Sequence, residues 1–247
     1  MSRILIVGAT SAIAQAIARQ YSAQSGHELV LVGRNQDKLD AMVSDLTVRG
    51  AKRVEVICQD LSDPDQMDGL VEHAWSLLSA IDIAIVAHGT LPDQKAIQDD
   101  WPAVSEALKV NGLSYLALMT ALGERMAARY SGSIAVIGSV AGDRGRQSNY
   151  VYGSAKGLVA LFSQGMRNRL LEAGVHVLTV KPGFVDTPMT ESFDKGGPLW
   201  ATPEKVACDV VNAIEKKRNV LYTPWFWWGI MVIIRSIPEM IFKKLSL

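Results

Sequence analysis

Short, continuous apolar runs alternate with helical segments along most of the chain, and this alternation restricts the possible folds more than any other feature. The runs do not alternate apolar with polar residues, which is typical of strands buried on both faces of a sheet. We expect such strands at residues 4–7, 28–32, 54–58, 81–86, 133–137, 176–180 and 219–222. The pattern predicts an α/β fold, with one doubly wound parallel sheet of about seven strands and helices on both faces.

The composition fits one protein domain with a large core, because 49% of the 247 residues are hydrophobic and 20% are charged. The 25 basic and 25 acidic residues cancel, which gives no electrostatic reason to expect a nucleic-acid partner. Cys58 and Cys208 lack the spacing of a disulfide framework or a zinc ribbon, and no metal site is predicted. The first strand begins at Arg3 and no apolar run reaches 18 residues, so we expect a cytoplasmic protein without a signal peptide or spanning helix.

Chemically distinctive residues follow the ends of the predicted strands. They are Gly8, Arg34, Asp60, Gly89, Ser139 and Pro182. In open parallel sheets, ligands bind in the crevice beyond the carboxyl ends of the strands. The sequence therefore predicts that these residues line one crevice.

The first strand-to-helix turn, residues 8–14, consists mostly of small residues, which let backbone N–H groups approach a pyrophosphate. Only Gly8 in this turn is glycine, so an ordinary tight turn is the alternative. The second strand ends at Arg34, where an NAD-binding fold has a carboxylate for the ribose. A guanidinium there favours NADP(H) over NAD(H), unless Arg34 is merely a surface residue. Asp60 is placed either to accept a bond from the adenine amino group or to cap a helix.

Tyr152 and Lys156 lie four residues apart at the start of a predicted helix, which puts both on one helical face. A free tyrosine has a pKa of about 10, and a nearby cation stabilises the phenolate and lowers that pKa. Lys156 and a positively charged cofactor ring together are expected to make Tyr152 a proton donor near neutral pH. The alternative is an ordinary helix start with one aromatic residue and one surface lysine.

With Ser139 thirteen residues before Tyr152, and Asn111 in a long middle helix, the chain is similar to the short-chain dehydrogenase/reductase family over nearly its whole length. The resemblance implies a Rossmann-type fold with the catalytic residues Asn111, Ser139, Tyr152 and Lys156. Two departures stand out. Alanines replace the later glycines of the first turn, and residues 86–89, Val-Ala-His-Gly, replace the family's Asn-Asn-Ala-Gly.

The resemblance also implies a set of cofactor contacts at the strand ends and in the Pro-Gly turn after the sixth strand. The expected cofactor-binding residues are Gly8, Thr10, Ser11, Ala12, Ile13, Arg34, Asp60, Leu61, Ala87, Gly89, Tyr152, Lys156, Pro182, Gly183, Val185 and Thr187. His88 is expected to line the groove or satisfy a backbone group rather than to act in catalysis.

By resemblance, hydride passes between a nicotinamide and a carbonyl carbon, and the alkoxide formed must be stabilised and protonated. Tyr152 would give the proton and Ser139 would hold the carbonyl oxygen. Lys156 would lower the pKa of Tyr152 and bind the nicotinamide ribose, and Asn111 would position a water that feeds protons through Lys156.

Residues 1–223 are expected to form the Rossmann-type domain, and residues 224–247 an apolar C-terminal extension. The extension, which we call the tail, has three tryptophans, an apolar run and a basic end. It is predicted to pack over the substrate cleft, to pack on a partner subunit or to lie in a membrane interface. The loop from Pro188 to Trp200 is expected to be a flap over the substrate. Since family members assemble through their middle helices, a homodimer or homotetramer is expected.

The leading hypothesis is an NADPH-dependent oxidoreductase that interconverts a carbonyl and a secondary alcohol on a bulky or lipid-linked substrate, such as a keto-sugar lipid. Residues 89–93 and the tail loosely resemble the branch that includes decaprenylphosphoryl-2-keto-ribose reductase. One alternative is a soluble reductase of acyl thioesters or steroid-like alcohols. Another is an NADP-binding sensor without turnover, for which a Ser-Tyr-Lys-Asn set would be superfluous.

Overall fold

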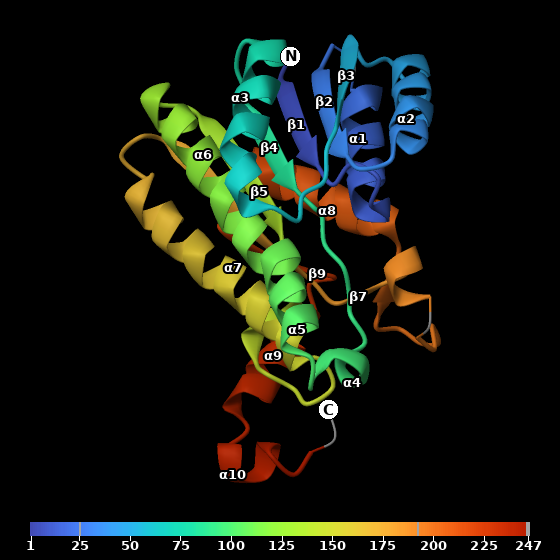
Figure 1. The fold of residues 1–247 in the computed structure, drawn as a ribbon, viewed down its shortest axis with the longest axis vertical. Helices are drawn as coiled ribbons and strands as arrows, with labels where there is room; N and C mark the ends of the chain where they lie inside the picture. Colours follow the sequence, from blue (N-terminus) through green and yellow to red (C-terminus); the bar gives the residue numbers. More distant parts are fainter. Residues whose placement is uncertain (25, 192, 246–247) are drawn as a thin grey trace.

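A seven-stranded parallel sheet forms the centre of the molecule (Figure 1). The computed structural model describes residues 1–24, 26–191 and 193–245. The sheet has the order β3-β2-β1-β4-β5-β6-β9, and every neighbouring pair is parallel. Its strands are β1 (Arg3–Val7), β2 (Glu28–Gly33), β3 (Arg53–Cys58), β4 (Ile83–Val86), β5 (Gly132–Ile137), β6 (Val175–Pro182) and β9 (Val220–Thr223). The prediction of a doubly wound parallel sheet of about seven strands is confirmed.

The strand order reverses beside β1, which is where such sheets open a crevice. β1, β2 and β3 proceed toward one edge of the sheet, whereas β4 starts again on the other side of β1. Val7 is in register with Val32 on one neighbouring strand and with Val86 on the other. The carboxyl ends of these three strands are therefore level, and the residues that follow them lie at one edge.

Helices cover both faces of the sheet (Figure 1). On one face α1 (Ala12–Ala23), α2 (Gln36–Val48) and α8 (Pro203–Glu215) pack against residues such as Ile4 and Ile6. On the other face α3 (Met67–Leu78), α6 (Ser114–Ala128) and α7 (Tyr150–Arg169) pack against Leu5 and Val7. Because successive residues of β1 enter opposite cores, the strand has to be apolar at every position. The remaining elements are α4 (Gln94–Ile97), α5 (Trp101–Leu108), α9 (Trp227–Ser236), α10 (Glu239–Phe242), and the short strands β7 (Phe184–Val185) and β8 (Trp200–Ala201).

The long middle helix expected to hold Asn111 is divided by a π-helical turn, Lys109–Leu113, which separates α5 from α6. Asn111 lies in this turn, and its side-chain amide donates to the carbonyl of Ala107 at 3.0 Å. Such turns inside α-helices often mark functional positions. The helix α8, in contrast, was not predicted, although Thr202 caps it by accepting from the N–H of Lys205 at 3.2 Å.

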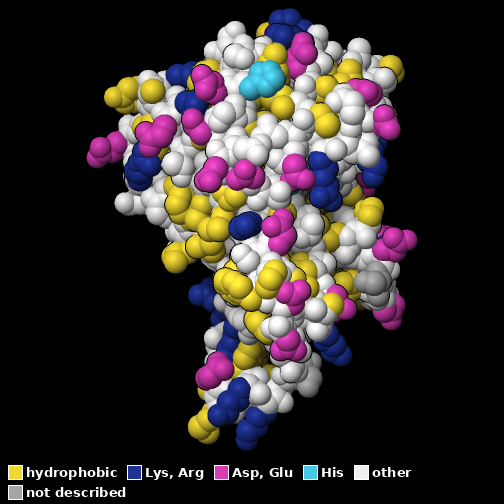
Figure 2. All heavy atoms as spheres, viewed as in Figure 1, with side chains coloured by type: hydrophobic (Ala, Val, Ile, Leu, Met, Phe, Trp, Pro, Cys, Tyr) yellow, Lys and Arg dark blue, Asp and Glu magenta, His cyan; other side chains and the backbone are white. Residues whose placement is uncertain are grey.

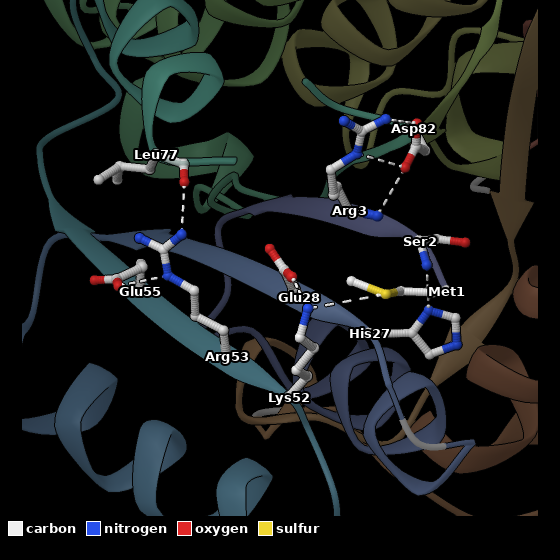
Figure 3. Close-up of polar contacts among 10 residues, drawn as sticks. All are labelled: Met1, Ser2, Arg3, His27, Glu28, Lys52, Arg53, Glu55, Leu77 and Asp82. Carbon is white, nitrogen blue, oxygen red and sulfur yellow. Dashed lines mark hydrogen bonds and ion pairs between the residues drawn. The ribbon is translucent and has the colours of Figure 1, made fainter. Parts of the chain in front are cut away.

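Ion pairs fasten the amino-terminal edge of the sheet, opposite the predicted crevice (Figure 3). Asp82 accepts bonds from Arg3 Nε at 2.9 Å and Nη2 at 2.7 Å, and Arg129 approaches it at 3.2 Å. Burial alone would raise the pKa of Asp82, but these donors outweigh it and hold the pKa at about 2. Lys52 and Glu28 pair beside them at 2.7 Å. The polar groups of this edge are thus occupied by partners within the chain.

Candidate active site

The turn after β1 approaches the strand β4 so closely that only glycine fits at its first position. Gly8 has a φ of +78°, and a Cβ built there would lie 2.4 Å from the backbone nitrogen of His88. Ser11 caps α1, since its hydroxyl accepts from the N–H of Ala14 at 3.3 Å. Within the described residues, the N–H groups of Ala12 and Ile13 have no acceptor. These N–H groups and the helix end fit a phosphate group.

Arg34 is exposed just past β2, and among the described residues it forms no ion pair. Its neighbour Asn35 caps α2 by accepting from the N–H of Lys38 at 2.9 Å. Asp60, after β3, accepts from the N–H of Ser62 at 2.7 Å. Hydrogen bonds from Ser62 lower the pKa of Asp60, and the charge of Arg34 adds to the effect. Asp60 therefore stabilises its own turn, whereas Asp63 caps the following 3₁₀ helix by accepting from the N–H of Asp65 at 3.1 Å.

Tyr152 and Lys156 lie one turn apart near the start of α7, and Ser139 follows the end of β5. Lys156 is buried, and its Nζ donates to the carbonyl of Ile137 at 3.2 Å. Its Nζ lies 5.7 Å from the centre of the Tyr152 ring. The Ser139 hydroxyl accepts from the N–H of Ala141 at 3.1 Å, and it also hydrogen-bonds Tyr152. Three of the four predicted catalytic side chains thus meet at the end of β5.

Asn111 joins this group through the backbone of Gly89. Its Oδ1 accepts from the N–H of Thr90 at 3.0 Å. A Cβ at Gly89, where φ is +145°, would lie 2.6 Å from Asn111 Oδ1 and 3.8 Å from Lys156 Nζ. Asn111 and Lys156 therefore face the same small space, and glycine is needed at position 89 to leave that space open.

The expected lowering of the Tyr152 pKa does not arise from the chain by itself. Burial raises the pKa of Tyr152 to about 12, and the hydrogen bond with Ser139 only partly opposes this. Burial also lowers the pKa of Lys156 to about 7. Both shifts have one cause, because a buried site disfavours the charged form of either group. In addition, Lys156 donates one hydrogen bond to the carbonyl of Ile137 at 3.2 Å.

The family model described as short chain dehydrogenase matches residues 2–197, most of the chain. The chain belongs to the short-chain dehydrogenase family. It is therefore an oxidoreductase that uses a nicotinamide dinucleotide, as the resemblance implied. An uncharacterized oxidoreductase of Mycobacterium tuberculosis is 32% identical over 242 residues, which are 98% of this chain and 96% of that protein. An uncharacterized oxidoreductase of Streptomyces coelicolor is 28% identical over 98% of this chain and 95% of its own.

Solved structures show the same fold. A levodione reductase matches with a TM-score of 0.83 and 20% identity, covering 92% of this chain and 98% of that one. A short-chain dehydrogenase from Sphingobium yanoikuyae, in complex with NADPH, matches with a TM-score of 0.81 and 24% identity, covering 97% of each chain. A bulky-bulky ketone specific alcohol dehydrogenase from Comamonas testosteroni has a TM-score of 0.80 and 24% identity, covering 97% of this chain and 96% of that one.

His88 departs from the short-chain dehydrogenase pattern and lies in the core rather than in the crevice. Its Nε2 is 2.8 Å from the hydroxyl of Ser114, and its ring stacks on Tyr115 with the ring centres 4.3 Å apart. Burial, followed by the charge of Lys156, lowers the pKa of His88 to about 3. His88 is therefore neutral, and its role in the structure is packing.

Two site residues escaped the sequence analysis. Tyr115 is fully buried, its hydroxyl donates to the carbonyl of His88, and its ring centre lies 4.1 Å from Lys156 Nζ. Gln94, in α4, accepts from the N–H of Val151 at 3.0 Å and so caps the helix that carries Tyr152. Neither residue belongs to a short motif, because each acts through contacts between distant segments.

A buried polar cluster holds the loop after Ser139 against the ends of β6 and β9. Asp143 accepts from Lys181 Nζ and, at 2.7 Å, from the hydroxyl of Tyr222. Lys181 immediately precedes the Pro-Gly turn, so the cluster links that turn to the loop that begins at Ser139. This is a third feature that the sequence did not reveal.

The Pro-Gly turn after β6 packs against the tail. A Cβ at Gly183 would lie 1.9 Å from Trp227 Nε1, and that nitrogen donates to the carbonyl of Leu199 at 3.3 Å. Phe184 stacks on Trp200 with ring centres 5.2 Å apart. The predicted flap is therefore tied down at its carboxyl end; its residue 192 lies outside the described residues.

The predicted cofactor residues fall at the carboxyl edge of the sheet or in the segments that follow it. Leu61 and Ala87 are buried beside β3 and β4, Val185 is in β7, and Thr187 precedes a 3₁₀ turn whose Thr190 hydroxyl accepts from its N–H at 3.2 Å. The constricted turn at Gly8, the free helix N–H groups and the exposed Arg34 fit a nicotinamide dinucleotide.

Proposed function

We propose that this short-chain dehydrogenase reduces a carbonyl to a secondary alcohol with NADPH. The observation that carries the proposal is the meeting of Ser139, Tyr152, Lys156 and Asn111 at one point beyond the sheet. A binding module without turnover has no use for a half-buried phenol bonded to a serine hydroxyl. The arrangement is typical of a site that must protonate an oxygen as negative charge develops on it.

Each residue has a separate task in this proposal. The cofactor supplies the hydride. Ser139 donates a hydrogen bond to the carbonyl oxygen, and Tyr152 transfers its proton to that oxygen. A pKa of about 12 keeps Tyr152 protonated in the absence of another charge, which suits a donor. Lys156, fixed by Ile137, and Asn111, fixed by Thr90, lie behind Tyr152 and return a proton to it through water.

The reaction is tested by isotope transfer. Purified protein with NADPH deuterated at C4 of the nicotinamide, given a panel of soluble and amphiphilic ketones, is expected to place one deuterium on the carbinol carbon of a product. Mass spectrometry measures the incorporation. If NADPH binds but no carbonyl of the panel is reduced, the proposal is contradicted and the sensor hypothesis gains.

We propose NADP(H) as the preferred cofactor because Arg34 is exposed, forms no ion pair among the described residues, and no carboxylate directly follows β2. Replacing Arg34 by alanine should weaken NADPH binding about ten- to a hundredfold, since bonds from a guanidinium to a phosphate are each worth roughly 1.5–3 kcal/mol. NADH binding should change little. Isothermal titration with both cofactors measures this selectivity.

The matched control for Arg34 is Lys38→Ala, which removes an exposed cation from the first turn of α2. This variant should weaken the binding of NADPH and of NADH only slightly, and to the same extent. If Arg34→Ala weakens the binding of NADPH and of NADH equally, the arginine does not bind the 2′-phosphate.

For the substrate we propose a bulky or lipid-linked carbonyl compound, with a keto-sugar lipid as the specific hypothesis. The apolar tail beside the Pro-Gly turn supports this choice, as does the loose resemblance to the keto-ribose reductase branch. A likeness in fold to a ketone dehydrogenase for bulky substrates agrees with it. We also propose a cytoplasmic protein, in line with its two free cysteines, Cys58 and Cys208.

A homodimer or homotetramer through α6 and α7 completes the proposal. Exposed leucines on this side, Leu113, Leu158 and Leu161, support it, because a second copy would cover them.

A further inference from the structure

The inner side of the tail is fixed to the rest of the chain. Trp227 and Met231 of α9 are buried with Val140, one residue after Ser139. Arg144 donates to the carbonyls of Ile234 and Ile237, both at 2.6 Å, at the end of α9. The tail therefore has a defined orientation as far as residue 245; residues 246–247 lie outside the described residues.

α10 is held by the same arginine. Arg144 Nη2 donates to Glu239 Oε2 at 2.9 Å, and its guanidinium carbon lies 3.6 Å from the centre of the Phe242 ring. One side of α10 is thus closed by a cation, a carboxylate and an aromatic ring. Met240 and Ile241 of this helix are exposed.

The tail carries many exposed apolar side chains. Seven of the twenty exposed large apolar side chains in the described residues belong to this segment, which is about a tenth of the chain. They are Trp225, Trp228, Val232, Ile233, Met240, Ile241 and Leu245. Trp225 is 80% exposed, Trp228 61% and Ile233 68%. Such a concentration on one segment marks an interaction surface.

Cations outnumber acids among these apolar groups. Arg235, Lys243 and Lys244 are exposed, and Glu239, the one acidic residue between 224 and 247, is bonded to Arg144. The segment thus carries a formal charge of +2, while the whole chain carries zero. In Figure 2 the tail is the projection at the bottom of the view, where yellow and dark-blue side chains lie together with some magenta ones.

We propose that this face of the tail, which we call the docking face, binds the surface of an anionic phospholipid bilayer. Tryptophan and aliphatic side chains enter the boundary between headgroups and acyl chains, while arginine and lysine stay at the phosphate level. Within the described residues, no helix combines the length and apolar character needed to cross a bilayer. The docking face therefore lies on the membrane rather than across it.

A second copy of the chain fits the docking face less well than lipid does. A two-fold contact would place the face against a copy of itself, so that the cations of one copy would lie near the cations of the other. Glu239, the one carboxylate of residues 224–247, is already paired with Arg144 at 2.9 Å. An anionic lipid surface supplies the opposite charge along the whole face.

Docking in this orientation brings the crevice to the lipid. Figure 1 shows α9 and α10 projecting from the end of the molecule toward which the strands of the sheet run. Trp227 covers Gly183, and Arg144 lies five residues after Ser139. If the proposed function holds, a lipid-linked carbonyl is presented to Ser139 and Tyr152 without leaving the membrane; this consequence rests on that proposal, whereas the docking does not.

The test is flotation of the full chain, loaded with NADPH, with two kinds of vesicle: phosphatidylcholine alone, and equal parts of phosphatidylglycerol and phosphatidylcholine. We expect binding to the anionic vesicles, weakened by high salt. The variant R235Q/K243Q/K244Q should bind about a hundredfold less, because each cation near such a surface contributes about a fivefold factor. The variant W225S/W228S/I233S should bind at least about tenfold less.

Matched controls exist elsewhere on the surface. Lys216, Lys217 and Arg218 form an exposed basic run of the same charge, and Trp101 is 71% exposed. K216Q/K217Q/R218Q and W101S should float like the unchanged chain. All variants are assayed with a water-soluble ketone, so that a failure of docking is separated from a failure of catalysis.

Three results would overturn the proposal. One is that the unchanged chain does not bind the anionic vesicles. Another is equal loss in the control variants. The third is a shift from dimer to monomer in sedimentation of W225S/W228S/I233S in the absence of vesicles, which would make the face a subunit interface.

Discussion

Replacing Tyr152 by phenylalanine is expected to slow carbonyl reduction about 10²- to 10⁴-fold while the protein keeps its fold and its affinity for NADPH. The change removes only the phenol oxygen, which is the proton donor in the proposed reaction. The ring remains, and it is the ring that packs near Lys156 Nζ, at 5.7 Å. The loss should therefore appear in kcat rather than in the dissociation constant of NADPH.

Tyr150→Phe is the matched control. Tyr150 starts the same helix and loses the same oxygen, but it is 42% exposed and has no lysine four residues later. It should retain nearly full activity. Equal activity of Tyr152→Phe and the unchanged enzyme would remove Tyr152 from the reaction, and equal loss in both variants would point to damage at the start of the helix.

Gly8→Ala should destabilise the protein by about 3 kcal/mol or more and abolish stabilisation by NADPH. An alanine at a φ of +78° is strained, and here its Cβ would also lie 2.4 Å from a backbone nitrogen that cannot rotate away. For a chain of this length the midpoint of thermal unfolding should fall by roughly 6–12 °C. Differential scanning calorimetry with and without NADPH measures both effects.

The chain contains a control that separates strain from collision. Gly26 has the same φ of +78°, but a Cβ there would meet nothing within 4 Å. Gly26→Ala should therefore cost only about 1 kcal/mol, or roughly 2–4 °C, and leave the NADPH effect intact. If both alanine variants unfold at the same temperature, the close approach of the first turn to His88 is not what requires glycine at position 8.

The sheet was predictable because its strands are apolar at every position and bounded by turn residues. α8 was predictable in principle, since Thr202, Pro203 and Glu204 form a helix start and Val206, Val210 and Ile214 have helical spacing. The strands β7 and β8 were not, because two residues show no period. The π turn at Asn111 leaves no mark in local composition.

The positions of the site residues could be predicted from the sequence more readily than the surroundings of their side chains. Ser139, Tyr152 and Lys156 could be placed by spacing and by strand ends, because those are local properties. The pKa values of Tyr152 and Lys156 could not be predicted. Burial raises the first and lowers the second, and burial depends on Tyr115 and other residues from distant segments. Asp143 and Lys181 are 38 positions apart, and only the sheet brings them together.

Arg144 joins the tail and the loop after Ser139 into a single structural unit. Its guanidinium is committed to the carbonyls at the end of α9 and to the ring of Phe242. If the tail were replaced by that of another family member, the Arg144 guanidinium, five residues from Ser139, would lose these carbonyl and ring contacts. When such extensions are exchanged among these enzymes, in nature or by design, residue 144 has to be exchanged together with the extension.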